Sequence, residues 1–270
     1  MKILRRILVL FLVLIVGALG IFYRNNGKLV FGVQIEDVNT HGFDNYQDIK
    51  AIDVDLELNE LIIEASDKPM IEVEYPVYKD KDLQIVVAQE GNTLRICRRD
   101  NKKLINIAWP SFNEDQSKTI IRIPKNHALE DLKLQLNMGE LRLNDIHSAK
   151  TKLTLNMGSL KATQSKLGAL NADLDMGSVD FEEVELSGDS KFELDMGSFN
   201  GSMKVGQGHV RMDVSMGSVD LQMYDGHYKY KTDVSMGDVK LKNTDEGSDS
   251  QDYDAVIEID VSMGDITVKE

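Results

Sequence analysis

The chain has 270 residues, long enough for one large or two small domains with a substantial core. Only 6% of its residues are aromatic and four are proline, which suits thin, repetitive β structure better than a bulky globular core. The net charge of −14 argues against a nucleic-acid partner, because phosphate binding needs basic patches. Most of this charge lies in residues 131–270, which carry 26 acidic and 14 basic side chains.

The N-terminal segment predicts a membrane anchor. A basic cluster in residues 1–6 precedes an unbroken apolar run over residues 7–23. At a rise of ~1.5 Å per residue this run spans roughly 26 Å, at the short end of what crosses a bilayer. The basic cluster favours residues 1–6 as a cytoplasmic tail and everything after Arg24 outside the cytoplasm. A cleaved signal peptide is the alternative, because Ala18-Leu19-Gly20 fits a small-x-small cleavage site.

Between the anchor and the repeats we expect a linker over residues 24–48 and then an irregular β region over residues 49–130. Alternating apolar residues predict strands in "IDVDLELNELIIEA", "MIEVEY" and "KTIIRIPK", the last of them stopped by Pro124. The stretch "LQIVVAQEGNTLRICRR" predicts a hairpin that turns at Glu90-Gly91-Asn92. A loop that carries Trp109 is expected before the last of these strands.

Cys97 is the only cysteine, so no internal disulfide is possible. It lies in "LRICRR", where the arginines could favour a thiolate. A catalytic thiol also needs a positioned histidine, and none is evident nearby in the sequence. We therefore interpret Cys97 as a small residue on a strand.

Residues 131–270 repeat a Met-Gly pair seven times, and the glycines are separated by 19, 19, 20, 20, 20 and 27 residues. Self-similarity at a fixed period of this length is the signature of a solenoid. We therefore predict an all-β protein, a β-solenoid of stacked coils of about 20 residues, capped by the irregular β region. The seven pairs are Met138-Gly139, Met157-Gly158, Met176-Gly177, Met196-Gly197, Met216-Gly217, Met236-Gly237 and Met263-Gly264.

Each repeat predicts a corner. In "LKLQLNMGELRL" the apolar residues alternate from Leu132 to Met138 and resume at Leu141, so the period of two breaks at Gly139-Glu140. Glycine supplies the backbone angles that such a break requires. The remaining residues of a repeat return the chain along a third side of the coil, with isolated apolar positions at Ile146, Leu167, Val184 and Val205. Connections are expected to be right-handed if the usual crossover rule holds.

Stacking at the ~4.8 Å strand spacing would place equivalent residues above one another. The seven methionines are then expected to form an internal ladder and the seven glycines a seam. A methionine ladder could also be a copper(I) site, since thioethers are soft ligands. Because each methionine is in phase with leucines and valines expected in the core, we favour core packing.

The residues on either side of the pair predict outward-facing ladders. They could hydrogen-bond to one another or chelate calcium, although calcium-binding β-rolls use a denser repeat of about nine residues. We favour hydrogen bonding. The residues before methionine are Asn137, Asn156, Asp175, Asp195, Ser215, Ser235 and Ser262, and those after glycine are Glu140, Ser159, Ser178, Ser198, Ser218, Asp238 and Asp265.

No catalytic, cofactor-binding or metal-binding residue is evident from the sequence. The five histidines lack metal-ligand spacing. The carboxylates are spread evenly, whereas acid–base chemistry needs a unique pair, and the repeated serines lack a nucleophile-elbow sequence. We therefore expect no enzyme and no cofactor. The acidic stretch at residues 245–255 reads as a surface loop, with a recognition loop as the alternative.

Residues 50–270 resemble the bacterial "putative adhesin" domain family of exported β-solenoid proteins, a domain of unknown function. The resemblance rests on the opening strand, the "GNTLRI" hairpin, "IIRIPK" and the repeated "L-x-[NDS]-M-G-[SDE]-[LVFI]" coils. It implies an extracytoplasmic, often membrane-tethered solenoid, linked in several relatives to envelope-stress loci. It offers no catalytic residues to carry over.

The leading functional hypothesis is a non-enzymatic, membrane-anchored module that binds a cell-wall component, another surface or a partner protein. The alternative is a self-assembling scaffold, because the chain ends at Glu270 directly after a predicted strand whose edge could stack with another copy. A polysaccharide-acting enzyme is a third possibility, since stacked β-coils occur in such enzymes.

Overall fold

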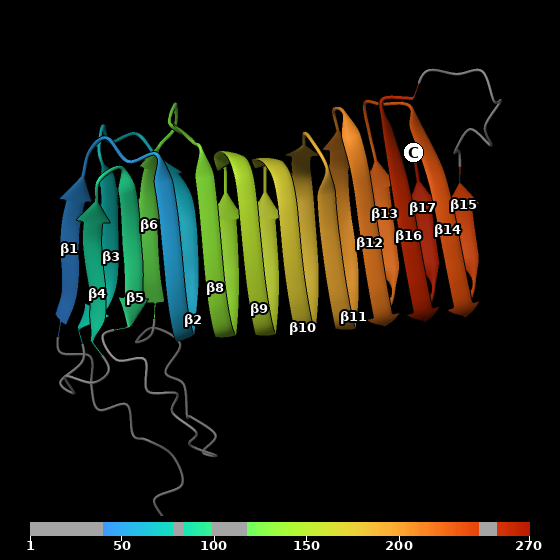
Figure 1. Ribbon diagram of the computed structural model, residues 1–270, viewed down its shortest axis with the longest axis horizontal. Coiled ribbons are helices and arrows are strands. Elements are labelled where there is room, and N and C mark those ends of the chain that lie inside the picture. Colours follow the sequence, from blue (N-terminus) through green and yellow to red (C-terminus); the bar gives the residue numbers. More distant parts are fainter. Residues whose placement is uncertain (1–39, 78–83, 99–117, 243–252) are drawn as a thin grey trace, which may run out of the picture. The chain divides into compact units, whose positions relative to one another are not determined.

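The computed structural model describes residues 40–77, 84–98, 118–242 and 253–270, all within one compact unit. These residues form strands and no helix (Figure 1). The strands are β1 (Thr40–Tyr46), β2 (Ala51–Ser66), β3 (Ile71–Val77), β4 (Ile85–Glu90), β5 (Thr93–Arg98), β6 (Lys118–Pro124), β7 (Ala128–Leu129), β8 (Asp131–Asn144), β9 (His147–Thr163), β10 (Lys166–Leu186), β11 (Ser190–Val205), β12 (Gly208–Met216), β13 (Val219–Met223), β14 (Tyr228–Met236), β15 (Val239–Lys242), β16 (Ala255–Met263) and β17 (Ile266–Lys269).

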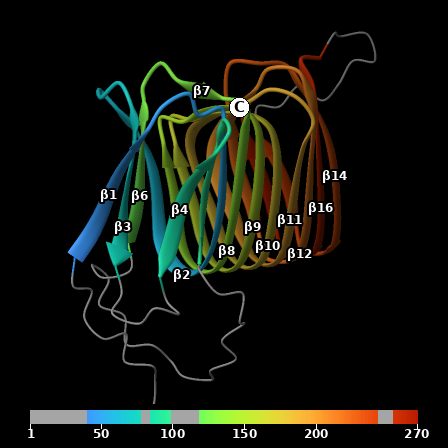
Figure 2. The ribbon, with the colours of Figure 1, turned by 60° about the vertical axis from the view of Figure 1, so that its left-hand side comes forward.

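The long strands stack as parallel coils, which confirms the predicted solenoid. β2, β8, β9, β10 and β11 pair in succession, and each coil repeats the register of the one before it. Leu136, for example, pairs with Leu155, and Leu155 pairs with Leu174. Figure 2 shows β8 to β12 one behind another as successive coils.

The core runs through the middle of the stack. In β10 the buried side chains include Leu174 before the corner, Val179 just after it, and Val184 on the third side. The apolar residues predicted for the third side, Ile146, Leu167, Val184 and Val205, are all at most 1% exposed. Three phenylalanines, Phe181, Phe192 and Phe199, pack edge to face with ring centroids 5.1–5.9 Å apart.

The glycine of each pair lies at a corner where backbone approaches backbone. Gly177 has a φ of 157°, and a Cβ added there would overlap the carbonyl oxygen of Gly158 in the coil beneath. The other six glycines have φ between 141° and 154°, and each lies in the same way against its neighbour in the stack. Glycine is therefore required by conformation and by space, as expected for a seam.

The methionines do not lie in the core, so the predicted internal ladder is wrong. Met157, Met176, Met196, Met216 and Met263 are 37–42% exposed, Met236 is 61% exposed, and Met138 is partly buried. The reason is that the alternation breaks one residue earlier than expected. Leu174 pairs with Leu194 and Met176 with Met196, but the pairing is interrupted at Asp175 and Asp195, and Asp175 and Met176 are both exposed, so the corner begins before methionine.

A second corner has no glycine. Asp145, Gln164 and Glu183 adopt φ of 56°, 49° and 54° at a spacing of 19 residues, each just before the third side. Hydrogen bonds between coils hold this corner: the Asp145 and Gln164 amides donate to the carbonyls of Thr163 and Glu182. Asp145, Gln164 and Glu183 are polar residues of three different types, so their spacing of 19 residues is the only sequence signal for this corner.

The solenoid begins at β2 rather than at residue 131, which corrects the expected boundary between cap and repeats. Residues 51–64 pair with residues 131–144 in coil register, and Asn59 occupies the place of glycine. The Asn59 side chain is buried and accepts a hydrogen bond from the Thr119 amide at 3.0 Å. Without a Met-Gly pair, this first coil could not be recognised from the motif.

Shorter strands cover the first coil. β5 and β6 pair parallel with the two halves of β2, and the antiparallel strands β4, β3 and β1 extend them. The predicted hairpin is confirmed as β4 and β5, with Gly91 at φ 62° in the turn, and the strand ending at Pro124 is confirmed as β6. β1 lies within residues 24–48, which were expected to be only a linker.

The last repeat does not lie at the end of the stack. β16 pairs with β12 on one side and β14 on the other, and β17 lies likewise between β13 and β15 (Figure 1). The final coil in the sequence, β16 and β17, therefore lies between the coil of β12 and β13 and the coil of β14 and β15. The free edge is formed by residues 228–242, and the edge expected at "DITVK" is paired.

Several predictions fall outside the described residues: the anchor at residues 7–23, the loop with Trp109, and most of the acidic stretch at residues 245–255. Within the described part of the chain, no helix has the length and apolar character needed to cross a membrane.

Gly177→Val should destabilise the protein by more than about 3 kcal/mol, because a β-branched residue is strained at this φ and overlaps the backbone below. Ser178→Ala is the neighbouring control and should change the free energy of unfolding by about 0.5 kcal/mol or less. Chemical denaturation of both variants measures the difference. Equal stability would contradict the close-packed seam.

Candidate functional site

The methionines form an outward row along the first corner, here called the Met row. In stacking order it comprises Met138, Met157, Met176, Met196, Met216, Met263 and Met236. Each member is paired in register with the next, so their backbones lie ~4.8 Å apart. Seven thioether side chains thus line one edge of the stack.

The residues beside the Met row make few hydrogen bonds to one another. Asn156 Nδ2 donates to Asn137 Oδ1 at 3.0 Å, and the Asp238 amide donates to Asp265 Oδ1 at 2.9 Å. These two contacts bear out the predicted hydrogen bonding in part. Asp175 and Asp195 are both exposed, and two carboxylates cannot hydrogen-bond to each other when both are ionised. The middle of the corner is therefore negatively charged.

A second row, which the sequence analysis missed, consists only of acidic residues. This acidic row lies three residues before the methionines, and its side chains point outward. Four of its members recur every 20 residues in the sequence, a signal that could have revealed the row. In stacking order its members are Asp173, Glu193, Asp213, Asp260 and Asp233.

Desolvation and mutual repulsion raise the pKa of two carboxylates of the acidic row. Partial desolvation, followed by the charges of Glu193, Asp175 and Asp195, raises the pKa of Asp173 above its usual range. The pKa of Asp260 is also raised, chiefly by desolvation, although the Arg211 charge opposes the shift. A raised carboxylate pKa means that folding disfavours the ionised form, so these groups oppose folding at neutral pH and cease to do so as they are protonated.

Basic side chains neutralise part of the acidic row. Arg211 donates to Asp213, Glu258 and Asp260 at 2.8–3.0 Å. Lys191 lies 2.6 Å from Glu193. Within the described residues, Asp173 forms no ion pair, although the positive charge of Lys152 opposes the rise in its pKa. The negative charges of Asp173, Asp175 and Asp195 thus act on one another beside the middle of the Met row.

The described residues contain no group of three or more histidine, cysteine, aspartate or glutamate side chains placed to hold a metal ion. The carboxylates are spaced along the stack and do not converge on one point. The face is thus a distributed anionic surface rather than a cage for a hard cation such as calcium.

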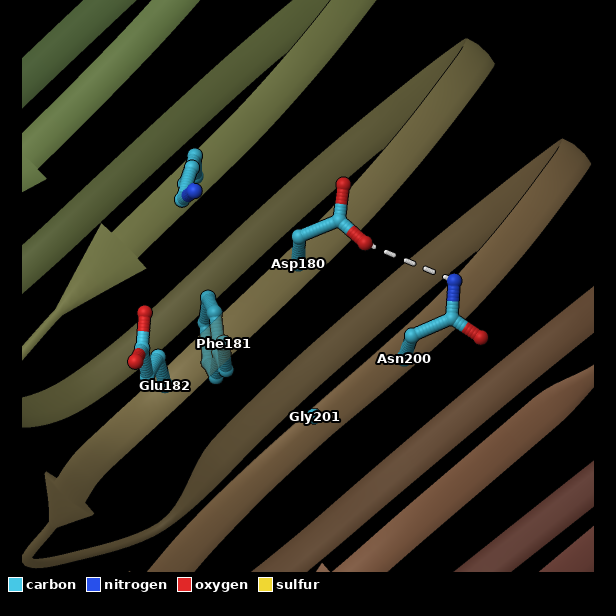
Figure 3. Close-up of a pocket in the computed structure, with 6 residues that line it drawn as sticks. Asp180, Phe181, Glu182, Asn200 and Gly201 are labelled. Carbon is cyan, nitrogen blue, oxygen red and sulfur yellow. Dashed lines mark hydrogen bonds between the residues drawn. The ribbon is translucent and has the colours of Figure 1, made fainter.

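A small hollow lies on the outer surface of β9, β10 and β11. It has a volume of about 300 Å³ and is lined by Lys161, Asp180, Phe181, Glu182, Asn200 and Gly201. Gly201 pairs with Phe181, and a Cβ at Gly201 would lie only 2.7 Å from the Phe181 Cβ. Figure 3 shows Asn200 Nδ2 reaching Asp180 Oδ1, at 3.4 Å. None of the lining residues is a histidine, serine or cysteine.

Cys97 lies partly buried on β5 with a free thiol, as expected for a strand residue. Within the described residues it forms no metal-ligand group with a histidine. The fold thus brings together the Met row and the acidic row, and it leaves Cys97 apart from both of them.

The chain has a distant likeness to several solved structures. A "putative adhesin" from Parabacteroides merdae is 14% identical, with a TM-score of 0.46 and coverage of 88% of this chain and 99% of that one. A "putative cell adhesion protein" from Clostridium sporogenes is 14% identical (TM-score 0.38; 85% and 98% covered). A "putative lipid binding protein" from Parabacteroides distasonis is 17% identical (TM-score 0.37; 86% and 98% covered).

No curated protein matches the chain. A family model described as Toastrack DUF4097 matches residues 49–270, from the start of the first coil to the last residue. Because this match covers most of the sequence, the chain belongs to the Toastrack DUF4097 family.

Proposed function

We propose that the protein is a membrane-anchored, extracytoplasmic binding module without enzymatic activity. The face that carries the acidic row and the neighbouring Asp175 and Asp195 would bind a cationic or extended component of the cell envelope, another surface, or a partner protein. The observation that carries this proposal is the repetition of the outward rows. Over residues 171–263, the methionines and the carboxylates of the acidic row recur from coil to coil at ~4.8 Å, so a ligand that fits one of these coils also fits the next.

The repetition of the outward carboxylates favours a binding function over a catalytic one. A catalytic centre is a unique constellation in which nucleophile, base and stabilising donors converge. On this face each carboxylate has near-copies in the neighbouring coils, and the hollow at Asp180 carries no convergent catalytic groups. Weak contacts repeated along the stack are instead suited to multivalent binding of an extended partner.

The location is proposed from the N-terminal sequence. The apolar run at residues 7–23, preceded by basic residues, favours a single span with the solenoid outside the cytoplasm. An exported solenoid is also what the resemblance to exported relatives implies. The anchor would hold the stack at the membrane surface, where its acidic faces meet the envelope.

External protease on intact cells should remove an epitope tag placed after Glu270, because the proposed topology places the C-terminus outside. A tag fused before Met1 is the matched control and should stay protected until the membrane is permeabilised. Immunoblotting of both fusions measures the result. A C-terminal tag protected on intact cells and cleaved after permeabilisation would overturn the topology.

Binding should weaken in proportion to the charge removed. The full chain in detergent micelles is screened against purified envelope polymers and against polylysine as a cationic probe. Asp175→Asn alone should weaken binding of the selected probe less than about 3-fold, and the set Asp173→Asn, Asp175→Asn, Glu193→Gln and Asp195→Asn should weaken it at least about 10-fold. Binding should also fall as salt rises.

A matched control removes the same charge from the first coils: Asp48→Asn, Asp67→Asn, Glu90→Gln and Asp131→Asn, all at exposed positions. This variant should bind as the parent does. Equal weakening by the control would mean that net charge alone matters. Complete loss from one carboxylate substitution in a folded protein would indicate a unique site and favour the polysaccharide-acting alternative.

A self-assembling scaffold is the second candidate, and the end coil is the observation that favours it. Val239 and Leu241 of β15 are 41% and 36% exposed, whereas their paired residues Ile266 and Val268 in β17 are fully buried. Within the described part of the chain, nothing pairs with the outer side of this coil. Such an edge is a template for a further strand.

The same coil carries a feature that opposes assembly. Lys229, Lys231, Lys240 and Lys242 are all exposed on β14 and β15. Lysines on an edge strand disfavour pairing with another copy, because like charges are brought together and must be desolvated. We therefore favour the binding module over the scaffold.

The full chain in detergent micelles should sediment with the mass of one protomer across a 100-fold range of concentration. Replacing the four edge lysines together with threonine should promote association, because the apolar edge is then unprotected. Four substitutions away from the edge, Lys68, Lys125, Lys152 and Lys166 to threonine, form the control and should leave the mass unchanged. Concentration-dependent growth of the parent chain would support the scaffold.

A further inference from the structure

The exposure of the Met row is systematic. Met157, Met176, Met196, Met216 and Met263, each with a methionine on both sides, are 37–42% exposed, whereas Met236 has one such neighbour and is 61% exposed. The simplest reading is that each side chain is partly covered by the next. The row is therefore a continuous line of neighbouring thioethers that remains open to solvent along its length.

Core packing does not account for these methionines. The chain buries other methionines when packing requires them: Met203 and Met212 are fully buried and Met223 is 2% exposed. The row instead lies among polar outward residues, such as Asp175 and Ser178 on either side of Met176-Gly177. Apolar side chains that recur at exposed positions among polar neighbours call for another explanation.

The spacing of the row suits a bridging metal ion. A metal–sulfur bond is about 2.3 Å in zinc–thiolate sites, so an ion held in line between two sulfurs separates them by about 4.6 Å. Neighbouring coils lie ~4.8 Å apart, and the flexible methionine side chain can adjust by the difference. Two successive members of the row can thus supply both ligands without any change in the backbone.

We propose that the Met row binds soft monovalent metal ions, Cu⁺ or its stable analogue Ag⁺, between the sulfurs of neighbouring methionines. Neutral thioethers select soft ions over calcium, magnesium and zinc. The described residues offer those harder ions no competing group of three histidine, cysteine or carboxylate ligands. Asp175 and Asp195 are the residues next to Met176 and Met196, and their charge raises the local concentration of cations.

The test uses the full chain in detergent micelles with Cys97→Ser as background, because a free thiol also binds soft ions. Silver nitrate is titrated into protein labelled with ¹³C at the methionine methyl groups, and bound silver is measured after desalting. The parent should retain at least two Ag⁺ per chain. The methyl signals of the row should shift, while those of Met203, Met212 and Met223 should not.

The decisive variant replaces Met157, Met176 and Met196 with leucine, which keeps the apolar side chain and removes the sulfur. It should lose at least half of the bound silver with its fold unchanged. The matched control replaces the buried Met203, Met212 and Met223 with leucine and should retain parental binding. Asp175→Asn with Asp195→Asn should lower the affinity several-fold but leave the stoichiometry unchanged.

Three results would overturn the proposal. The first is parental silver binding by the leucine variant of the row. The second is loss of binding in the aspartate variant with the methionines intact, which would indicate oxygen ligands. The third is an unshifted set of row methyl signals at saturating silver, and in that case the exposed row would be an apolar contact surface for a partner.

Discussion

The whole stack depends on one close contact, the backbone of each corner glycine against the carbonyl oxygen of the residue paired with it in the neighbouring coil, which is a glycine everywhere except at Asn59. At Gly177 and its equivalents this contact leaves no room for a side chain. A one-residue slip would put another residue into that space and turn the core side chains outward. The contact therefore fixes the register and requires nearly equal coils, which explains the separation of 19 or 20 residues between most of the glycines.

A fixed register has a chemical consequence for the surface. Whatever side chain stands outward at one coil stands above its equivalent in the next, so that rows of like groups form. Desolvation, and after it repulsion between carboxylates, raises the pKa of Asp173, and basic partners such as Arg211 relieve the repulsion in only part of the row. The fold thus favours recognition by repeated weak contacts and disfavours the convergence of unlike groups that catalysis needs.

The sequence predicted the solenoid, the glycine corner and the apolar third side because all three leave a period in the residue types. It misplaced the methionines, since alternation alone cannot show that the strand pairing is interrupted at Asp175 and that Met176 is therefore already part of the exposed corner. The corner at Gln164 escaped notice because polar residues in that conformation have no distinctive composition. The first coil was missed because Asn59 replaces glycine, although the Asn59 carbonyl oxygen meets Gly139 as the corner glycines meet one another.

The order of the last two coils follows from their inward residues. Coil 255–269 presents Ile257, Ile259 and Ile266 to the core, whereas coil 228–242 presents Tyr230, Thr232 and Val239 at the paired positions. Enclosing the isoleucine-rich coil on both sides buries more apolar area, and each fully buried isoleucine contributes about 2 kcal/mol. The lysine-bearing coil is then left at the edge, where its charges are solvated and discourage pairing. Chain order and stacking order therefore differ because the residues of the final coil are more apolar than those of the coil before it, and burial between two coils stabilises the more apolar one.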